Sequence, residues 1–121
     1  MKPLWLALAS IAMSVTAQFA FKAGMTALKQ GALSTPQPLW RLLWAALTQP
    51  QVLLGFALYG LGAVIWLRVL ADWEVSKAYP LVGLGFAMTA VISLALGEAV
   101  GAMRLAGIAL ICIGVVLVGR S

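Results

Sequence analysis

A polar stripe runs along an otherwise apolar stretch near the start of the chain. Ser14, Gln18 and Lys22 follow one another at four-residue steps, with Ser10 one step earlier. Four residues turn an α-helix through about 400°, so each side chain lies only about 40° from the previous one. The stripe offers hydroxyl, amide and ammonium groups but no carboxylate. It can therefore donate hydrogen bonds to an anion, whereas it holds no charge that would neutralise a cation.

The composition indicates that this stripe lies inside a membrane. The chain has 121 residues, of which 64% are hydrophobic and 9% are charged, whereas soluble domains are nearer half apolar and a quarter charged. We expect an all-α integral membrane protein with a single domain, residues 1–121, built as a four-helix bundle. Polar groups at membrane depth are costly and usually face a partner helix or a water-filled cavity, which favours a partnered or functional stripe.

Four apolar runs are long enough to span, because a hydrocarbon core of roughly 30 Å needs about 20 apolar residues. We expect these helices at about residues 4–28, 51–70, 75–96 and 102–118. The first run could also pass for a signal peptide, but its apolar stretch continues beyond the small-residue cleavage pattern, which fits a retained helix better. Residues 39–48 are too short to span, and we interpret them as an amphipathic helix in the head-group region, anchored by Trp40 and Trp44.

The third spanning run carries helix-breaking residues near its start. Pro80 removes the backbone donor that would reach Ser76 and clashes with the preceding turn, so a kink is expected there. Gly83 and Gly85 follow closely, and together with Pro80 they form a candidate hinge for alternating access. The alternative is that proline and glycine are simply commoner in membrane helices.

The charge balance is basic, with 8 Lys+Arg against 3 Asp+Glu and no His, for a net charge of +5. This indicates anionic lipid head groups or an anionic substrate. No basic cluster lies on a soluble face, so nucleic acid is not an expected partner. If the spans alternate, the positive charges divide evenly between the two sides: Lys2, Arg68, Lys77 and Arg120 against Lys22, Lys29, Arg41 and Arg104. Setting aside Lys22 as a residue within the bilayer favours a cytoplasmic N-terminus.

Enzymatic chemistry is not indicated by the residue types. The chain has no His, a single Cys and only three acids, with no cluster of metal ligands and no nucleophile–base pair. We therefore expect no metal, no cofactor and no catalytic residue.

Short motifs along the chain resemble those of the small multidrug resistance transporters, within the drug/metabolite transporter superfamily. The pattern G-x-x-L-I-x-x-G-V in the last helix is similar to their dimerisation motif and comprises Gly107, Leu110, Ile111, Gly114 and Val115. Lys22 near the end of the first helix and Ala78-Tyr79 opening the third also match. The resemblance implies a dimer joined by this motif, whose small residues let helices approach closely. These exporters carry a glutamate eight residues before the lysine, where this chain has Ser14, so proton-coupled cation export is not supported.

A closer resemblance is to the four-helix flippase subunits that move undecaprenyl-phosphate-linked aminoarabinose across the bacterial inner membrane. Three patterns carry it: S-V-x-x-Q-x-x-x-K at Ser14, Val15, Gln18 and Lys22; A-Y-P-x-x-x-L-x-F at Ala78, Tyr79, Pro80, Leu84 and Phe86; and an acid, an arginine displaced by one position and a glycine at Glu98, Arg104 and Gly107. The resemblance implies a multi-pass protein of the inner membrane, acting as a homodimer or with a paralogous subunit on a polyprenyl-phosphate glycolipid.

The expected substrate-binding residues are those of the stripe together with polar and aromatic groups elsewhere: Ser14, Gln18, Lys22, Trp66, Tyr79, Glu98 and Arg104. Lys22 is best placed to meet a phosphate, and its neighbours can bond to phosphate or sugar oxygens. Each also has a structural explanation, such as snorkelling of Lys22 or interfacial anchoring of the aromatic groups. Two other functions stay open. A small-molecule or multidrug exporter would need a carboxylate that the first helix lacks, and a non-transporting accessory subunit would need a partner.

Overall fold

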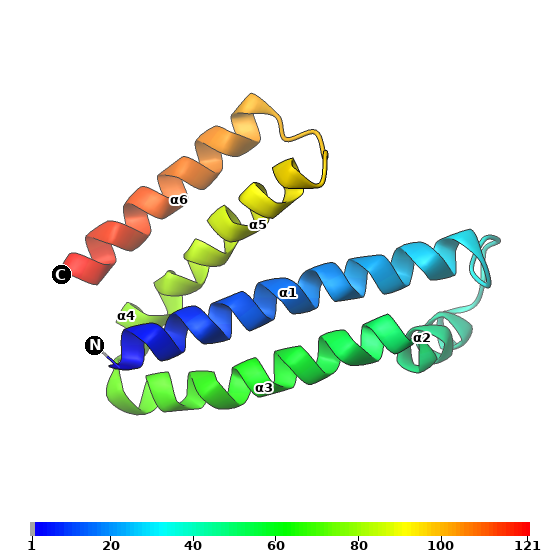
Figure 1. The fold of residues 1–121 in the computed structure, drawn as a ribbon, viewed down its shortest axis with the longest axis horizontal. Helices are drawn as coiled ribbons and strands as arrows, with labels where there is room; N and C mark the ends of the chain where they lie inside the picture. Colours follow the sequence, from blue (N-terminus) through cyan, green and yellow to red (C-terminus); the bar gives the residue numbers. More distant parts are fainter. Residues whose placement is uncertain (1) are drawn as a thin grey trace.

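The chain folds entirely as helices and connecting loops over residues 2–121, the part whose backbone the computed structural model describes; side chains are described from residue 4 onward. The elements follow in the order α1 (Lys2–Gln30), α2 (Leu39–Thr48), α3 (Pro50–Asp72), α4 (Val75–Ala78), the 3-10 helix η1 (Tyr79–Gly83), α5 (Leu84–Ala95) and α6 (Ala102–Arg120) (Figure 1). The side chain of Lys2, which was counted among the positive charges, lies outside the described residues.

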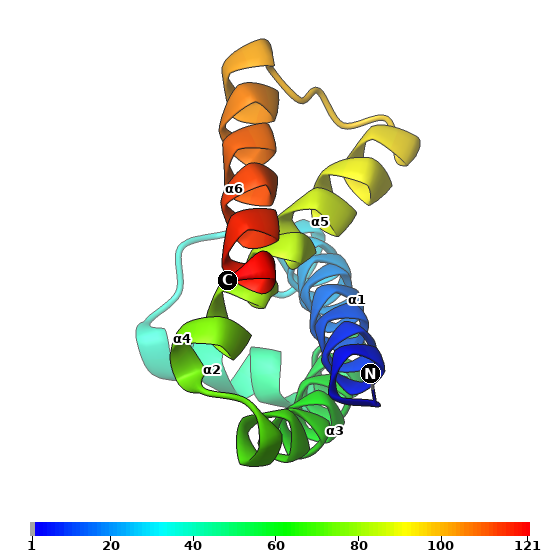
Figure 2. The same ribbon diagram turned by 90° about the vertical axis from the view of Figure 1, so that its left-hand side faces the viewer.

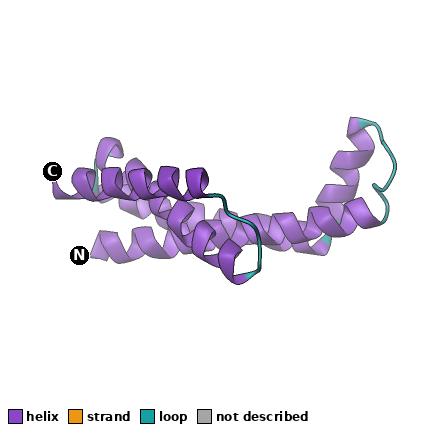
Figure 3. Ribbon diagram, turned by 90° about the horizontal axis from the view of Figure 1, so that it is seen from above, coloured by secondary structure: helices purple, strands orange, loops and turns teal. Residues whose placement is uncertain are grey.

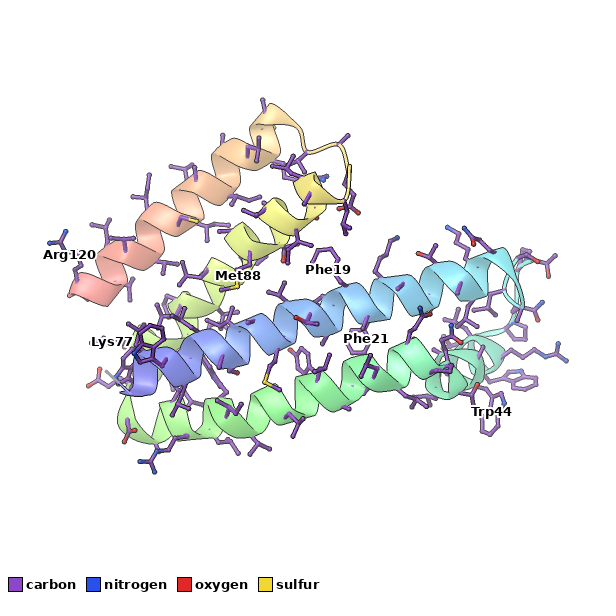
Figure 4. All side chains as sticks on the ribbon, in the orientation of Figure 1. Phe19, Phe21, Trp44, Lys77, Met88 and Arg120 are labelled. Carbon is purple, nitrogen blue, oxygen red and sulfur yellow. The ribbon has the colours of Figure 1, made fainter. Side chains whose placement is uncertain are left out.

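Four stretches are long and apolar enough to cross a membrane: Leu4–Gln30, Pro50–Asp72, Val75–Ala95 and Ala102–Arg120. They match the four predicted spans to within a few residues, and α2 coincides with the short helix expected at residues 39–48. The prediction of an all-α, four-helix membrane protein with one further short helix is therefore confirmed. The two tryptophans of α2, Trp40 and Trp44, are 65% and 69% exposed, and Trp44 projects outward at the end of the molecule (Figure 4).

The third span is broken, whereas the sequence predicted one helix over residues 75–96 with a kink. It consists of α4, a 3-10 turn and α5. Pro80 explains the break, because it has no N–H to donate to Ser76 and its ring crowds the previous turn. The backbone instead closes tighter i→i+3 bonds, and the N–H of Leu84 donates to the carbonyl oxygen of Leu81.

The first arm of the molecule is the antiparallel pair of α1 and α3, which lie side by side along their length (Figures 1 and 2). Glycines on α3 allow this close approach. A Cβ at Gly55 would lie 2.6 Å from the ring of Phe21 and 3.1 Å from the carbonyl oxygen of Ala17. About two turns further on, the hydroxyl of Ser10 donates a 2.6 Å hydrogen bond to the carbonyl oxygen of Gly62. This bond links the two helices inside the apolar span.

The second arm is the antiparallel pair of α5 and α6, which leaves the first arm at an angle (Figures 1 and 3). The arms join where η1 and the start of α5 cross α1. A Cβ at Gly85 would lie 3.3 Å from Cγ2 of Val15 and 3.4 Å from Cγ2 of Ile11, so glycine is what permits this crossing. The buried core is centred on the same junction and comprises Ala7, Ile11, Val15, Val69, Ala78, Leu81 and Val115. Phe19 and Met88 pack against it between the two arms (Figure 4).

Candidate functional site

A cavity of about 340 Å³ lies at the junction of the two arms and is bounded by α1, α3, η1 and the start of α5. We call it the central cavity. Its lining residues are Ser10, Ile11, Ser14, Val15, Tyr59, Gly62, Ala63, Trp66, Leu67, Tyr79, Val82 and Gly85. Ser14 lies ten residues after Leu4, which is about 15 Å along the helix and roughly half the thickness of the hydrocarbon core. By this measure the cavity reaches from the N-terminal side of the spans, at Tyr79, to about mid-depth, at Ser14.

The polar groups of the central cavity are neutral. Ser14, Tyr59 and Tyr79 bring hydroxyl groups and Trp66 an indole N–H, and none of the lining residues is an acid or a base at neutral pH. Ser10 differs from the others, because its hydroxyl hydrogen is already donated to α3. The site can thus hydrogen-bond an uncharged polar group such as a sugar, and it offers no charge to a cation.

Three of the predicted substrate residues, Ser14, Trp66 and Tyr79, meet in this cavity although they come from three different elements. Tyr59 joins them and was not among the predicted site residues. A signal for Tyr59 was present in the sequence: it precedes Trp66 by seven residues, which places both rings on one face of α3. Ser14 could have satisfied itself by bonding to the carbonyl four residues earlier, but in the described structure it is Thr16 that makes such a bond, to Ala12 at 2.8 Å.

Gln18 and Lys22 lie outside the lining of the central cavity, and both are exposed. They follow Ile11 and Val15 by seven residues each, and seven residues fall only about 20° short of two full turns. Gln18 and Lys22 therefore lie on the same face of α1 as the two residues that contact Gly85, but two turns further along the helix. At that point α5 has already diverged from α1 (Figure 1). The polar stripe thus leads out of the cavity onto the flank of α1 that faces the space between the arms.

Glu98 and Arg104 line a second cavity of about 240 Å³, which we call the terminal cavity. It lies at the end of α5, beneath the loop that leads into α6, and its lining residues are Phe86, Thr89, Ala90, Ser93, Glu98, Val100, Arg104 and Ile108. Its two charged groups do not pair with each other: among the described residues the ion pair formed is that of Arg68 with Asp72, at 3.6 Å. Thr89 and Ser93 were not predicted, although their four-residue spacing in an apolar helix is the same signal that marked the stripe on α1.

The hinge candidates occupy the junction itself. Pro80 is the second residue of the 3-10 turn, and Gly83 and Gly85 are buried where η1 meets α6 and α5 meets α1. The positions of the two glycines give a reason other than flexibility, because neighbouring helices leave no room for a Cβ. Whether the segment bends during transport remains a prediction.

The predicted dimer motif on α6 divides between two faces. Ile111 and Val115 pack inward, each with a methyl carbon 2.9 Å from the position of a Cβ at Gly83, and Val115 is only 6% exposed. The outward face carries the other members of the motif: Leu110 and Gly114 lie on it, and Gly107, one turn before Ile111, lies at its edge. A Cβ at either glycine would meet nothing within 4 Å, and Leu110 is 69% exposed. This outward face is apolar and open along α6.

Four short-looped apolar spans with a cavity of neutral donors between them define a small multi-pass membrane protein. Comparison with known proteins is more specific. The probable 4-amino-4-deoxy-L-arabinose-phosphoundecaprenol flippase subunit ArnE of Pseudomonas aeruginosa is 40% identical over 103 residues, which cover 80% of this chain and 90% of that protein. The protein of the same name from Pseudomonas paraeruginosa has the same identity and coverage, and that of Pseudomonas savastanoi is 38% identical over 78 residues, 64% of this chain and 68% of that protein.

The chain therefore belongs to the family of the ArnE-type flippase subunits, as the sequence motifs had predicted. No family model and no solved structure matches it.

Proposed function

We propose that this protein is a subunit of a flippase that moves a polyprenyl-phosphate-linked sugar across the bacterial inner membrane. The observation that carries the proposal is the central cavity, lined by hydroxyl groups and an indole and free of acidic residues, in a chain whose relatives are named for moving such a lipid. A sugar needs hydrogen-bond partners when it leaves water, because unpaired polar groups are costly in hydrocarbon. The central cavity supplies these partners as far as mid-depth in the membrane.

The two ends of the substrate require different surroundings. The sugar is held by the hydroxyl groups of Ser14, Tyr59 and Tyr79, while the prenyl chain stays in lipid, which is as apolar as the outer helix faces. The phosphate lies beside Gln18 and Lys22 on the exposed flank of α1, where the ammonium group provides a charge-assisted hydrogen bond. In this arrangement the stripe on α1 is a path that leads from the cavity to a phosphate-binding cation.

A second subunit completes this path. Gln18 and Lys22 are exposed in the single chain, and a polar path through the membrane must be shielded from lipid. The outward face of α6, with Gly107 and Gly114 seven residues apart on one side, is suited to close helix–helix contact. The partner is a second copy or a paralogous chain, and an assembly is supported by the naming of the relatives as flippase subunits.

Orientation follows from the positive charges near the ends of the spans. With Lys22 placed within the membrane, the side of the N-terminus carries one more Lys or Arg than the opposite side, and the more positive side faces the cytoplasm. The N-terminus, the C-terminus and the α3–α4 turn are then cytoplasmic, whereas α2 and the α5–α6 loop face the outer side.

Transport by variants of the α1 stripe tests the proposal. The purified protein, alone and with its paralogous partner, is reconstituted in liposomes with a fluorescent or radiolabelled polyprenyl-phosphate sugar in one leaflet. Lys22→Ala and Gln18→Leu are each expected to lower the flipping rate at least tenfold, because each removes a group that bonds to the phosphate. Lys29→Ala is the matched control: it removes an exposed lysine from the same helix face, two turns nearer to water.

Normal transport by both Lys22→Ala and Gln18→Leu would show that the stripe is structural and would remove the proposed path. If the wild-type chain moves no such lipid, alone or with a partner, the flippase proposal itself is wrong. Native mass spectrometry of lipids that copurify provides an independent check, since a bound phosphorylated polyprenol is expected.

A further inference from the structure

The terminal cavity has a composition that the central cavity lacks, namely one positive and one negative side chain that face the same space. Glu98 and Arg104 both line it, yet within the described part of the chain these two side chains form no ion pair with each other. Two opposite charges that share a cavity without meeting leave room for a group that carries both signs. Such a ligand would bond to each of them through charge-assisted hydrogen bonds.

The hydroxyl groups of α5 add to this site. Ser93 is only 7% exposed, lines the terminal cavity and takes part in none of the described side-chain hydrogen bonds. No buried side-chain nitrogen or oxygen among the described residues lacks a hydrogen-bond partner, so the hydroxyl oxygen of Ser93 is accessible from the cavity and not enclosed. Thr89 lies one turn earlier in the same lining. The two hydroxyl groups are therefore free to bond to a ligand that enters the cavity.

The start of α6 adds positive potential near the terminal cavity, although Ala102 and Met103, which carry its first N–H groups, are not among the lining residues. The helix begins at Ala102 without a side-chain cap, so its first N–H groups have no acceptor and its dipole is positive at this end. Arg104 lies in this first turn. A phosphate held by Arg104 would also gain from the helix terminus, whereas an ammonium group is expected on the opposite side, beside Glu98.

We infer that the terminal cavity is a second head-group site, which binds a ligand carrying both an ammonium and a phosphate group: the ammonium beside Glu98, the phosphate beside Arg104, and hydroxyl oxygens beside Ser93 and Thr89. With a volume of about 240 Å³ it is smaller than the roughly 300–1,000 Å³ of typical ligand pockets, so it takes a head group and not a prenyl chain. This inference rests on the proposed function, since it makes the ligand an amino-sugar phosphate of the transported lipid.

The position of the terminal cavity fits a second station on one path. Ser93 follows Gly85, which lines the central cavity, by eight residues on α5. Eight residues correspond to about 12 Å along the helix axis. The head group therefore moves by about two-fifths of the hydrocarbon thickness between the neutral central cavity and a charged site near the membrane face opposite to the chain termini.

Binding of soluble head groups by the full chain in uncharged detergent tests the assignment. The probes are 4-amino-4-deoxyarabinose 1-phosphate and the same sugar phosphate with a hydroxyl in place of the amine. Wild-type protein is expected to bind the amine at least tenfold more tightly, and Glu98→Gln is expected to abolish this preference. Arg104→Gln is expected to weaken both probes at least tenfold while keeping their ratio. Glu74→Gln and Arg120→Gln make the same charge changes at exposed positions outside the cavity and serve as controls.

An unchanged amine preference in Glu98→Gln would overturn the assignment. Phospholipid head groups with an ammonium and a phosphate share this chemistry, so phosphoethanolamine is the competitor. If it displaces the amino-sugar phosphate at equal concentration, the cavity is a phospholipid site and its assignment to the transported lipid is overturned. The readout is binding and not transport. A wild-type chain that binds with the expected preference but flips nothing would therefore refute the proposed function and leave this site intact.

Discussion

Gly83 lies where the 3-10 turn η1 meets α6, and its replacement by alanine distinguishes a flexible hinge from a close contact. A Cβ at this position would lie 2.9 Å from Cγ2 of Ile111 and 2.9 Å from Cγ2 of Val115. Nonbonded carbon atoms prefer about 3.5–4.0 Å, so the shortfall is roughly 0.6–1.1 Å against two methyl groups. Overpacking of this kind costs about 1–3 kcal/mol. We expect Gly83→Ala to lower the free energy of unfolding by this amount.

The measurement is reversible unfolding in mixed micelles of a mild detergent and sodium dodecyl sulfate, followed by far-ultraviolet circular dichroism. Gly60→Ala is the matched control, because it lies within a spanning helix and its Cβ would meet nothing within 4 Å. We expect Gly60→Ala to leave the unfolding free energy unchanged or to raise it by up to about 1 kcal/mol, because alanine is the better helix former. Val115→Ala removes one of the two opposing methyl groups, so the double variant Gly83→Ala/Val115→Ala should be more stable than the sum of the single effects by about 0.5–3 kcal/mol.

Transport by the same variants separates the two roles of Gly83. If the glycine serves only for close packing, the double variant recovers transport together with stability. If backbone freedom at Gly83 is also needed for bending, the double variant regains stability and remains slow. A Gly83→Ala variant as stable as Gly60→Ala, or the absence of coupling with Val115→Ala, would refute the close-packing argument.

Two further predictions concern contacts of α6 and α1. Gly114→Leu should weaken self-association, because a bulky side chain would separate the outward faces of α6 in two chains. Self-association is measured by energy transfer between labelled chains in liposomes, with Gly119→Leu, at another open position outside the motif, as the control. Equal association of both variants would exclude the outward face of α6 from the dimer interface. Ser10→Ala should lower the unfolding free energy by about 0.5–1.5 kcal/mol, since it leaves the carbonyl oxygen of Gly62 without its 2.6 Å hydrogen bond. An unchanged unfolding midpoint would show that the bond adds nothing.

The helical elements could be predicted because each depends on a local property of the chain. Hydropathy over about 20 residues identifies a span wherever it occurs, and the four spans agree with this expectation. Pro80 likewise has a local effect, and a disturbance of the third span was expected. Its form, a 3-10 turn that divides the span into α4 and α5, depends in addition on how η1 packs against α6.

The candidate site was predictable only in part, because its residues come from different helices. Helical spacing places Ser14, Gln18 and Lys22 near one line on α1, but it does not say where a neighbouring helix leaves that line. The structure brings Ser14 together with Trp66 and Tyr79 and leaves the other two stripe residues exposed. Thr89 and Ser93 were missed although their four-residue spacing was visible, since two hydroxyl groups in an apolar helix indicate a site only when a cavity lies beside them.

The sequence alone specifies the number of spans, the lack of a carboxylate in the polar stripe of the first helix, and the motifs shared with the flippase subunits. Each of these is a property of a single segment or of the composition. The three-dimensional packing specifies which polar groups share a space. Gly55, Gly83 and Gly85 let helices approach at defined points, and the angle between the two arms then separates the neutral central cavity from the charged terminal cavity. Helix crossings depend on contacts between residues far apart in the chain, which local periodicity does not encode.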